Sequence, residues 1–414
     1  MPPSLLTEAV RAEVLRLAPG ELPCYVHDLR SLRAHAAAVR EALPPAVELY
    51  YAAKANPAPQ VLTALTPWTD GFEVSSGGEL AHVRATVPGR PLAFSGPGKT
   101  PAELAAALDA GVERVHAESL HEVRMLMALA AKGHMPGRRP VRVLLRIDPP
   151  VPDGVLAGSA LTMGGRPAPF GMAPGDAAEA LRLLTGTDRT AIEPVGVHAH
   201  LASGLPADAL LRVAGAVVDA ARELFRGHGV RLDEVTVGGG MAVDYTRPAE
   251  RFDWAAYGAG LGALARLHPG TRLRVEPGRA LTAYCGWYVT EVLDVKRSHG
   301  EDVAVVRGGT HHFRTPAAKG HDQPAEVVPV GTWPHPWPRP VATGDRVTVA
   351  GQLCTPKDVL SRGLTARGLR AGDRVAFALA GAYAWNISHR DFLMHPPPVF
   401  RFLGAAGTEA PPEC

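Results

Sequence analysis

Short apolar segments alternate with longer helical stretches through the first two thirds of the chain. Eight of the segments are rich in β-branched or apolar residues and have the length of a strand. They are ELYYAA from 48, GFEV from 71, PLAFS from 91, ERVHA from 113, VRVLLRI from 141, PVGVHAHL from 194, EVTVGG from 234 and RLRVE from 272. Alanine- and leucine-rich stretches predict helices at 101–110, 119–132, 206–228 and 252–267, with a less regular one at 175–184. Eight such units in about 230 residues match the size of a (β/α)8 barrel.

The pattern changes after EPGR at 276–279. Apolar runs now follow one another with few helical stretches between them, which is typical of an antiparallel β domain. These runs are YCGWYVTEVLDV, DVAVV, RVTVA and RVAFALA. Residues 308–343 are rich in His, Pro and Trp and include GTWPHPWPRP, which is too proline-dense for a central strand, so we expect a long loop there.

The two patterns predict two domains. We expect the barrel at 30–280 and a β-sandwich or β-barrel domain at 281–404, to which an N-terminal strand near 23–27 is added. Residues 405–414 are expected to form a flexible tail, with Cys414 as an inert end.

Composition narrows the classes of function. The 414 residues are 46% hydrophobic, and 43 Lys+Arg against 41 Asp+Glu give a formal net charge of +2. A balanced charge gives no general attraction to nucleic acid or to a membrane surface. The four cysteines are widely spaced with no CxxC pair, which argues against a disulfide framework or a zinc–thiolate site and favours a reducing, cytoplasmic setting. The N-terminal segment MPPSLLTEAVRAEVLRLAPG carries charges among its apolar positions, so we expect neither a signal peptide nor a membrane span.

The candidate chemistry gathers where the predicted strands end. The carboxyl ends of barrel strands form one rim, and polar or glycine residues follow every strand there. In strand order they are Lys54; Ser75 to Glu79; SGPGKT; His116 and Glu118; Arg146 and Asp148; His200 and Ser203; Gly238 to Gly240; and Glu276, Gly278 and Arg279. A lysine, histidines, glycines and an acid on one rim indicate a site for an anionic, aromatic cofactor.

Lys54 is one of only six lysines and follows an apolar run at the expected barrel mouth. A lysine beside a desolvating wall can become a neutral nucleophile and form a Schiff base, although a lone lysine is more often simply solvated. The glycines at 238–240 let backbone N–H groups approach a phosphate, to which Ser203 and Arg279 could add donors. Taken alone, a glycine triplet is equally typical of a turn.

Glu276 could pair with a pyridinium nitrogen, or it could form a salt bridge with an arginine. His198 and His200 alternate along one strand and face the same side. They could bind a metal, but no third ligand follows at a useful spacing, so we favour an imidazole against a cofactor ring and expect no metal. GPGKT at 96–100 is not a phosphate-binding P-loop, because the first glycine of that motif would fall at Ala93.

These segments, in this order, resemble the fold-type III pyridoxal-phosphate decarboxylases, the group that contains diaminopimelate, ornithine and arginine decarboxylases. The matching motifs are YYAAKAN, GVHAHLASG, VTVGGG, VEPGR, GQLCTPKD at 351–358 and AGAYAWNIS at 380–388. The resemblance covers nearly the whole chain. It implies an alanine racemase-like (β/α)8 barrel followed by a β domain, with pyridoxal 5'-phosphate as cofactor.

The resemblance also implies a role for each motif residue. Lys54 would hold the cofactor as a Schiff base, His200 would stack on its ring, and Glu276 would hold the pyridinium. The cofactor phosphate would be bound by Ser203, Gly238, Gly239, Gly240, Gly278, Arg279 and Tyr383. Cys354 and Asp358 would be contributed across the interface of a homodimer with two shared sites, and Cys354 would protonate the carbanion after loss of carbon dioxide.

The chain departs from the family pattern at two positions. A usual glycine is Ala202, which is tolerated if its φ is negative. Ornithine and diaminopimelate decarboxylases resemble one another in having an acid directly after the cysteine, and this acid meets the substrate's distal ammonium. Here the residue at that position is Thr355. A free diamino acid would therefore lack this partner, although Asp358 could still reach it.

Three further segments look most like the branch that acts in siderophore assembly, on citryl-diaminopropionate and related conjugates of the staphyloferrin B and vibrioferrin pathways. They are LTMGGRPAPFGM at 161–172, THHFRTP at 310–316 and AYAWNISHRDFLMHPPP at 383–398. Arg314, His311 and His312 are then candidates to meet the carboxylates of such a conjugate. The expected activity is α-decarboxylation of the amino-acid part of the conjugate.

Four alternatives stay open at this point. The first is a diaminopimelate- or ornithine-type decarboxylase, and the second is an amino-acid racemase on the related barrel. The others are a cofactor-carrying protein without catalysis and a non-catalytic partner protein. The segment around Cys354 and the set of Lys54, Glu276 and the glycine loop argue against the last three.

Overall fold

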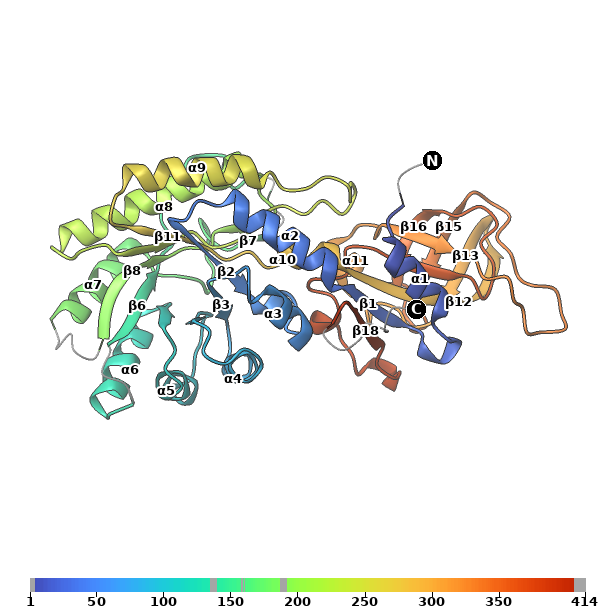
Figure 1. The fold of residues 1–414 in the computed structure, drawn as a ribbon, viewed down its shortest axis with the longest axis horizontal. Coiled ribbons are helices and arrows are strands. Elements are labelled where there is room, and N and C mark those ends of the chain that lie inside the picture. The colour runs from blue at the N-terminus through green and yellow to red at the C-terminus, as the bar shows by residue number, and fades with distance from the viewer. Residues whose placement is uncertain (1–3, 135–139, 158, 160, 187–191, 406–414) are drawn as a thin grey trace, which may run out of the picture. The chain divides into compact units, whose positions relative to one another are not determined.

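The computed structural model describes residues 4–134, 140–157, 159, 161–186 and 192–405, so most of the expected tail, with Cys414, lies outside the described residues. The chain forms two compact units (Figure 1). The barrel unit is Arg33–Ala242 with Phe252–Leu281. The β unit is Met1–Leu32, Val243–Arg251 and Thr282–Cys414.

A closed barrel of eight parallel strands forms the centre of the barrel unit. The eight strands predicted from the sequence are the eight that close it, so the predicted fold class is confirmed. Neighbours around the barrel run β10, β11, β2, β3, β4, β5, β6 and β8. Their bounds are β2 (Val47–Ala52), β3 (Gly71–Val74), β4 (Leu92–Phe94), β5 (Arg114–Ala117), β6 (Val141–Arg146), β8 (Ile192–His198), β10 (Glu234–Thr236) and β11 (Arg272–Val275).

Helices cover the outside of this barrel (Figure 1). The predicted ones are α5 (Pro101–Asp109), α6 (Leu120–Ala131), α7 (Pro174–Thr185), α8 (Ala207–Gly227) and α9 (Trp254–Leu267). Three further helices were not predicted, namely α2 (Leu29–Ala42), α3 (Pro59–Leu65) and α4 (Gly77–Thr86). Helix α5 begins with a capping box, in which Thr100 and Glu103 satisfy each other's backbone N–H groups. A two-stranded sheet joins β7 (Leu161–Thr162) to β9 (Ala202–Ser203).

Buried ion pairs hold the strands of the barrel together inside it. Arg114 on β5 contacts Glu234 at 2.5 Å (Nε to Oε2), and Arg274 on β11 reaches the same Oε2 at 3.1 Å. Arg274 also donates to Glu48 on β2. Arg114 and Arg274 are each 1% exposed, so their charges depend on these carboxylates for solvation.

The β unit is built around one sheet. Its strand order is β14, β17, β12, β13, β15 and β16, and β1 pairs with β12 and β18. The bounds are β1 (Cys24–Asp28), β12 (Gly286–Ser298), β13 (Glu301–Val306), β14 (Ala325–Val328), β15 (Arg346–Ala350), β16 (Val359–Thr365), β17 (Arg374–Phe377) and β18 (Val399–Leu403). The sheet is mostly antiparallel, but β13–β15 and β1–β18 are parallel pairs. Helix α1 (Glu8–Arg16) also belongs to this unit.

The expectation of one long loop over 308–343 was wrong. Helix α11 (Thr315–Lys319) begins with a proline in its first turn, and β14 pairs with β17 at the edge of the sheet. Both elements are too short to stand out beside the surrounding prolines. Residues 331–340, which contain the prolines and tryptophans, form no helix or strand.

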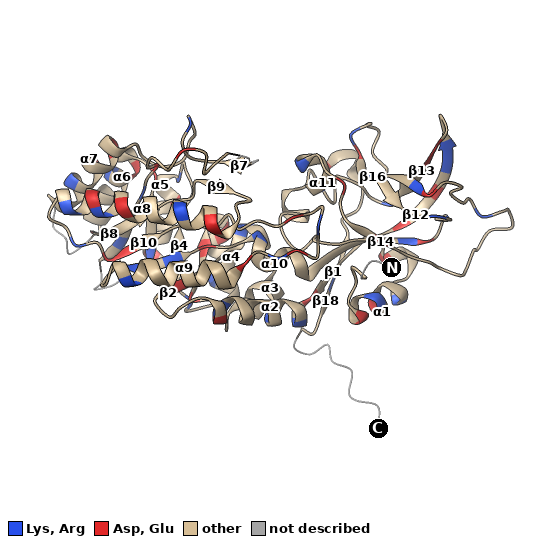
Figure 2. Cartoon of the chain, turned by 90° about the horizontal axis from the view of Figure 1, so that it is seen from above, with Lys and Arg blue, Asp and Glu red and all other residues tan. Residues whose placement is uncertain are grey.

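Charge is mixed along the outer helices. Figure 2 shows both acidic and basic residues on α8, where Arg212 and Asp208 form an ion pair one turn apart. None of the helices in the described part of the chain is both long enough and apolar enough to cross a membrane.

Candidate active site

Lys54 lies at the carboxyl end of β2, in a short 3-10 turn (Ala53–Ala55). Its Nζ is 2.9 and 2.8 Å from the two carboxylate oxygens of Glu73 and 3.2 Å from Ser75 Oγ. The Lys54 side chain is 43% exposed, whereas that of Glu73 is 2% exposed. The amine therefore reaches the rim of the barrel while its acceptors lie inside.

Glu73 is the buried end of this contact. Burial alone would raise the pKa of the Glu73 carboxyl, but the Lys54 ammonium and the Ser95 and Ser75 hydroxyls hold that pKa below its usual value. An ionised Glu73 keeps the Lys54 amine oriented and can accept a proton from it. Glu73 was not among the predicted site residues, because it lies inside the predicted strand GFEV and not beyond its end.

Glu276 follows β11 directly and is 6% exposed. Its Oε2 lies 3.1 Å from Nε2 of His198. No described group hydrogen bonds to its other carboxylate oxygen, Oε1, although that atom is buried. Burial raises the pKa of the Glu276 carboxyl. A buried acceptor without a partner needs a donor from elsewhere.

His116, His198 and Glu276 form a cluster of three potential metal ligands whose ligand atoms lie within 4.8 Å of one another. His200, the expected companion of His198, is not part of this cluster, and the place beside His198 is taken by His116 of β5. The His116 and His198 rings stack with centroids 4.3 Å apart. Burial lowers the pKa of both imidazoles well below the usual value, so both are neutral.

The glycine loop follows β10, and neighbouring atoms lie close to each of its three glycines. A Cβ on Gly239 would lie 2.4 Å from the Glu276 carbonyl oxygen, and one on Gly240 would lie 2.2 Å from the Ala202 carbonyl oxygen. Gly238 and Gly240 have φ of +72° and +91°. No other residue type fits this loop. Ala202 lies in β9 with negative φ, as the sequence analysis required.

His200 joins this loop to Ser203. Its Nδ1 accepts a hydrogen bond from the Gly239 N–H at 3.1 Å, and its Nε2 is 3.4 Å from Ser203 Oγ. Burial and the Lys54 ammonium lower the pKa of His200 to about 3, so the ring is neutral. Because Nδ1 accepts, the proton is on Nε2. Gly278 is buried and Arg279 half-buried at the start of the short helix α10 (Arg279–Thr282).

Lys99, the lysine of GPGKT, is buried and used within the fold. Its Nζ donates to Glu122 Oε1 at 2.6 Å and to the carbonyls of Gly96 and His116 at 2.8 Å each. All of its donors have partners, so it offers no contact to a phosphate.

The remaining predicted residues belong to the β unit. Cys354 is an exposed free thiol and Thr355 is half-buried. Arg314 is exposed at the start of α11. Tyr383 is half-buried, has φ of +48°, and accepts a hydrogen bond from the Thr315 hydroxyl with its carbonyl.

Asp358 and His312 differ from the expectation that they contact substrate. Asp358 is 2% exposed, and its carboxylate accepts from the Thr310 N–H and hydroxyl at 2.6 and 2.8 Å and from the Leu353 N–H at 2.8 Å. His312 is also 2% exposed, with Nε2 3.0 Å from the Pro396 carbonyl oxygen and Nδ1 3.4 Å from the Tyr288 hydroxyl. These bonds hold neighbouring loops together and engage both side chains within the β unit.

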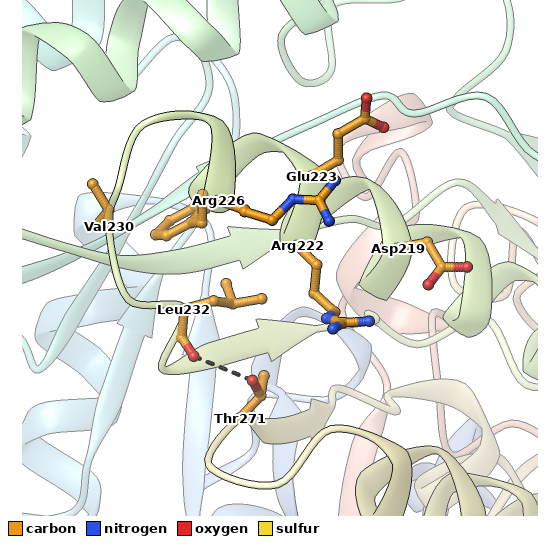
Figure 3. A pocket seen from close by; sticks show the side chains of 8 residues that line it. Asp219, Arg222, Glu223, Arg226, Val230, Leu232 and Thr271 are labelled. Atoms are coloured by element: carbon orange, nitrogen blue, oxygen red, sulfur yellow. Dashed lines mark hydrogen bonds between the residues drawn. The ribbon is translucent and has the colours of Figure 1, made fainter.

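A surface groove of about 530 Å³ opens beside α8 (Figure 3). It is lined by Asp219, Arg222, Glu223, Phe225, Arg226, Val230, Leu232 and Thr271. Leu232 and Thr271 precede β10 and β11, so the groove lies at the amino ends of the strands. Lys54, His200 and Glu276 lie at the opposite rim, and the groove is separate from them.

Comparison with known proteins identifies the family of the chain. Residues 29–283 match the family model described as the pyridoxal binding domain of pyridoxal-dependent decarboxylases. The chain belongs to this family. The decarboxylase is 33% identical over 382 residues to the 2-[(L-alanin-3-ylcarbamoyl)methyl]-2-hydroxybutanedioate decarboxylase of Staphylococcus aureus, with 92% of this chain and 93% of the relative covered.

Two further likenesses extend over most of the decarboxylase. It is 32% identical over 415 residues to the L-glutamyl-[BtrI acyl-carrier protein] decarboxylase of Niallia circulans, covering 94% of this chain and 90% of the relative. Its fold is similar to the crystal structure of diaminopimelate decarboxylase from Helicobacter pylori complexed with L-lysine. That likeness has a TM-score of 0.81 at 23% identity and covers 95% and 93% of the two chains.

The rim of the decarboxylase fits pyridoxal phosphate. The unpartnered Glu276 Oε1 is a buried acceptor for a protonated ring nitrogen. The glycine loop brings no side chain of its own between its backbone and a phosphate, and Lys54 offers an amine. When bound, pyridoxal phosphate supplies an aldehyde for an amine and a ring that withdraws electrons from the bond to be broken.

Proposed function

We propose that this pyridoxal-phosphate-dependent decarboxylase removes the α-carboxylate from the amino-acid part of a carboxylate-rich conjugate, of the citryl-diaminopropionate type used in siderophore assembly. In this proposal Lys54 carries the cofactor, His200 lies against its ring and Glu276 holds the ring nitrogen. Its phosphate is bound by Ser203, Gly238, Gly239, Gly240, Gly278, Arg279 and Tyr383. Cys354 delivers a proton to Cα after carbon dioxide has left.

The observation that carries the choice of substrate is the lack of an available acid beside Cys354. Thr355 stands where an acid would meet a distal ammonium, and Asp358 is buried with its carboxylate engaged by Thr310 and Leu353. A distal ammonium placed here would be left unpaired, which is unfavourable in a closed site. A substrate whose distal end is neutral or anionic does not meet this cost.

Arg314 supports the same conclusion. It is exposed in the β unit and can offer a guanidinium to carboxylates. The name of the Staphylococcus aureus relative describes citrate joined by an amide to the side chain of diaminopropionate. The Niallia circulans relative acts, by its name, on a glutamyl group attached to a carrier protein, which also has no distal ammonium.

The substrate is tested by carbon dioxide release from citryl-diaminopropionate, diaminopimelate and ornithine. We expect the conjugate to be preferred and Arg314→Ala to raise its KM with little change in kcat, because a distal carboxylate contact stabilises ground and transition states alike. Arg367→Ala, which changes an exposed arginine of the same unit, is the control. Equal turnover of a free diamino acid would replace this proposal with the diaminopimelate- or ornithine-type alternative.

The cofactor lysine is tested separately by borohydride reduction and peptide mass mapping. We expect the pyridoxyl group on the peptide that contains Lys54, and no labelled peptide from Lys54→Ala. Lys99→Met removes a lysine that is already used within the fold, and its pyridoxyl label should stay on Lys54. A label on any other lysine in the wild-type protein would refute the assignment of Lys54.

The proposal includes an assembly and a location. We infer a homodimer with two shared sites, to which the partner contributes Cys354, and a cytoplasmic setting. Cys24, Cys285 and Cys354 are free thiols, which is consistent with a reducing compartment.

A further inference from the structure

The two oxygens of the Glu276 carboxylate have different surroundings. Oε2 lies 3.1 Å from His198 Nε2, whereas Oε1 has no hydrogen-bond partner among the described residues. Both groups are buried, with His198 3% and Glu276 6% exposed. One oxygen is therefore held by the protein, and the other is left for a donor that enters the site.

The burial of His198 determines which ring nitrogen carries its proton. The imidazole is neutral, because burial and the neighbouring Arg146, His200 and Lys54 disfavour a second proton, although Glu73 favours one. It has one N–H, and Glu276 is ionised once it faces a protonated ring nitrogen and can then only accept. The proton of His198 is then on Nε2, directed at Oε2, and Nδ1 is left without a hydrogen bond to any described residue.

His116 restrains the His198 ring from the β5 side. The two rings are stacked at 25° between their planes. Neither nitrogen of His116 has a hydrogen-bond partner among the described residues, and the side chain is 0% exposed. Its contribution to the cluster is therefore the packing of a flat ring.

We propose that His198 is a positioning residue for Glu276. Its Nε2–H fixes Oε2 and so directs Oε1 at the cofactor's ring nitrogen, while stacking on His116 prevents the His198 ring from turning. His198 touches neither substrate nor cofactor in this arrangement. The inference concerns how the ring nitrogen is kept protonated. It applies whichever amino acid is decarboxylated.

The test compares two cofactors: pyridoxal phosphate and its 1-deaza analogue, in which carbon replaces the ring nitrogen. The wild-type apoprotein should bind the natural cofactor more tightly than the analogue. His198→Phe keeps a ring against His116 but loses the N–H. We expect it to weaken binding of pyridoxal phosphate about tenfold, the usual effect of losing a hydrogen bond to a charged group, and to leave binding of the analogue unchanged.

His198→Gln should restore the preference for pyridoxal phosphate, because its amide N–H can occupy the place of Nε2. If the phenylalanine variant does not fold, His198→Asn serves as a second variant that lacks the contact. The asparagine amide is shorter and does not reach Oε2. His134→Phe is the matched control, since His134 forms an exposed histidine–carboxylate pair with Asp109 in the same unit. It should leave both affinities unchanged.

Dissociation constants measured by fluorescence titration decide the outcome without any turnover. Equal weakening of both cofactors in the His198→Phe and His198→Asn variants would overturn the proposal, since the effect would then be one of packing alone. Unchanged affinity for pyridoxal phosphate would overturn it as well. If the wild-type protein bound both cofactors equally, Glu276 would not contact the ring nitrogen. The proposal depends on that contact and would then be overturned.

Discussion

At the scale of single residues, His311 links the stability of the β unit to pH. The side chain is 0% exposed, and burial lowers the pKa of His311 to about 4 and that of His312 to about 3. His312 and His395 lie against the ring, with centroids 3.9 and 4.9 Å away. The charged or titratable groups that act on His311 are His395, Asp358 and His389.

The unfolded chain takes up protons on these histidines near pH 6.5, before the folded protein does. Their contribution to stability is therefore complete above that pH and is lost as the pH falls through the folded values. We expect the free energy of unfolding to fall between about pH 6.5 and 4, by up to about 1.4 kcal/mol per pH unit for each histidine.

His311→Phe should flatten this dependence, because its ring cannot be protonated. Urea unfolding followed by circular dichroism at about pH 7.5 and about pH 5 measures the difference. His335→Phe, at an exposed histidine of the same unit, should leave the dependence as in the wild type. An identical pH dependence in the wild type and His311→Phe would contradict the prediction.

At the scale of elements, Gly215 weakens the long helix α8. A Cβ at this position would meet nothing within 4 Å. Gly215→Ala should raise the free energy of unfolding by about 0.5–1 kcal/mol, because alanine loses less backbone freedom in a helix. Gly196→Ala is a control that should lower the free energy of unfolding, since its Cβ would lie 1.8 Å from the Glu234 carbonyl oxygen between two barrel strands. Thermal unfolding measures both, and a lower melting temperature for Gly215→Ala would refute the argument.

The ion pairs inside the barrel predict a larger effect. Glu234→Gln removes a carboxylate shared by Arg114 and Arg274, and leaves buried positive charge with too few partners. We expect a loss of about 3–5 kcal/mol. Glu179→Gln breaks the exposed pair with Arg182 and should change stability little. Urea unfolding gives both values, and a small effect of Glu234→Gln would mean that water already solvates the arginines.

The elements were more predictable than the contacts between them. Each barrel strand is a short apolar run bounded by polar residues, and this local pattern located all eight. His116 could not be paired with His198 in this way, because their contact depends on β5 and β8 lying on either side of β6 in the barrel. Glu73 is unusual in the sequence, because it is an acid within a strand that is predicted to be buried. Its role becomes evident only when the neighbouring strands are known.

In the β unit, the burial of two candidate residues could not be predicted. His312 lies in the predicted loop 308–343 and Asp358 in the segment GQLCTPKD, and polar residues of such segments are usually exposed. In the structure both are buried by their own hydrogen bonds. Loop burial depends on tertiary packing, which the local sequence does not encode. Arg314 and Thr355 could be chosen as substrate candidates from the sequence. Nothing in the sequence indicated that His312 and Asp358 are buried.

At the scale of the whole molecule, the proposed shared site predicts complementation between two inactive variants. Lys54→Ala removes the cofactor amine and Cys354→Ala removes the proton donor. If each site takes Lys54 from one chain and Cys354 from its partner, a dimer of one variant with the other contains one intact site and one site lacking both groups.

An equal mixture, dissociated and reassociated, should then recover about a quarter of the wild-type rate, because half of the dimers are mixed and each has one working site of two. Each variant treated alone is the control and should stay inactive. If both groups came from the same chain, every site in the mixture would lack one of them and no activity would return. Carbon dioxide release, with size-exclusion chromatography to show that dimers have reformed, therefore separates a site shared between subunits from two independent ones.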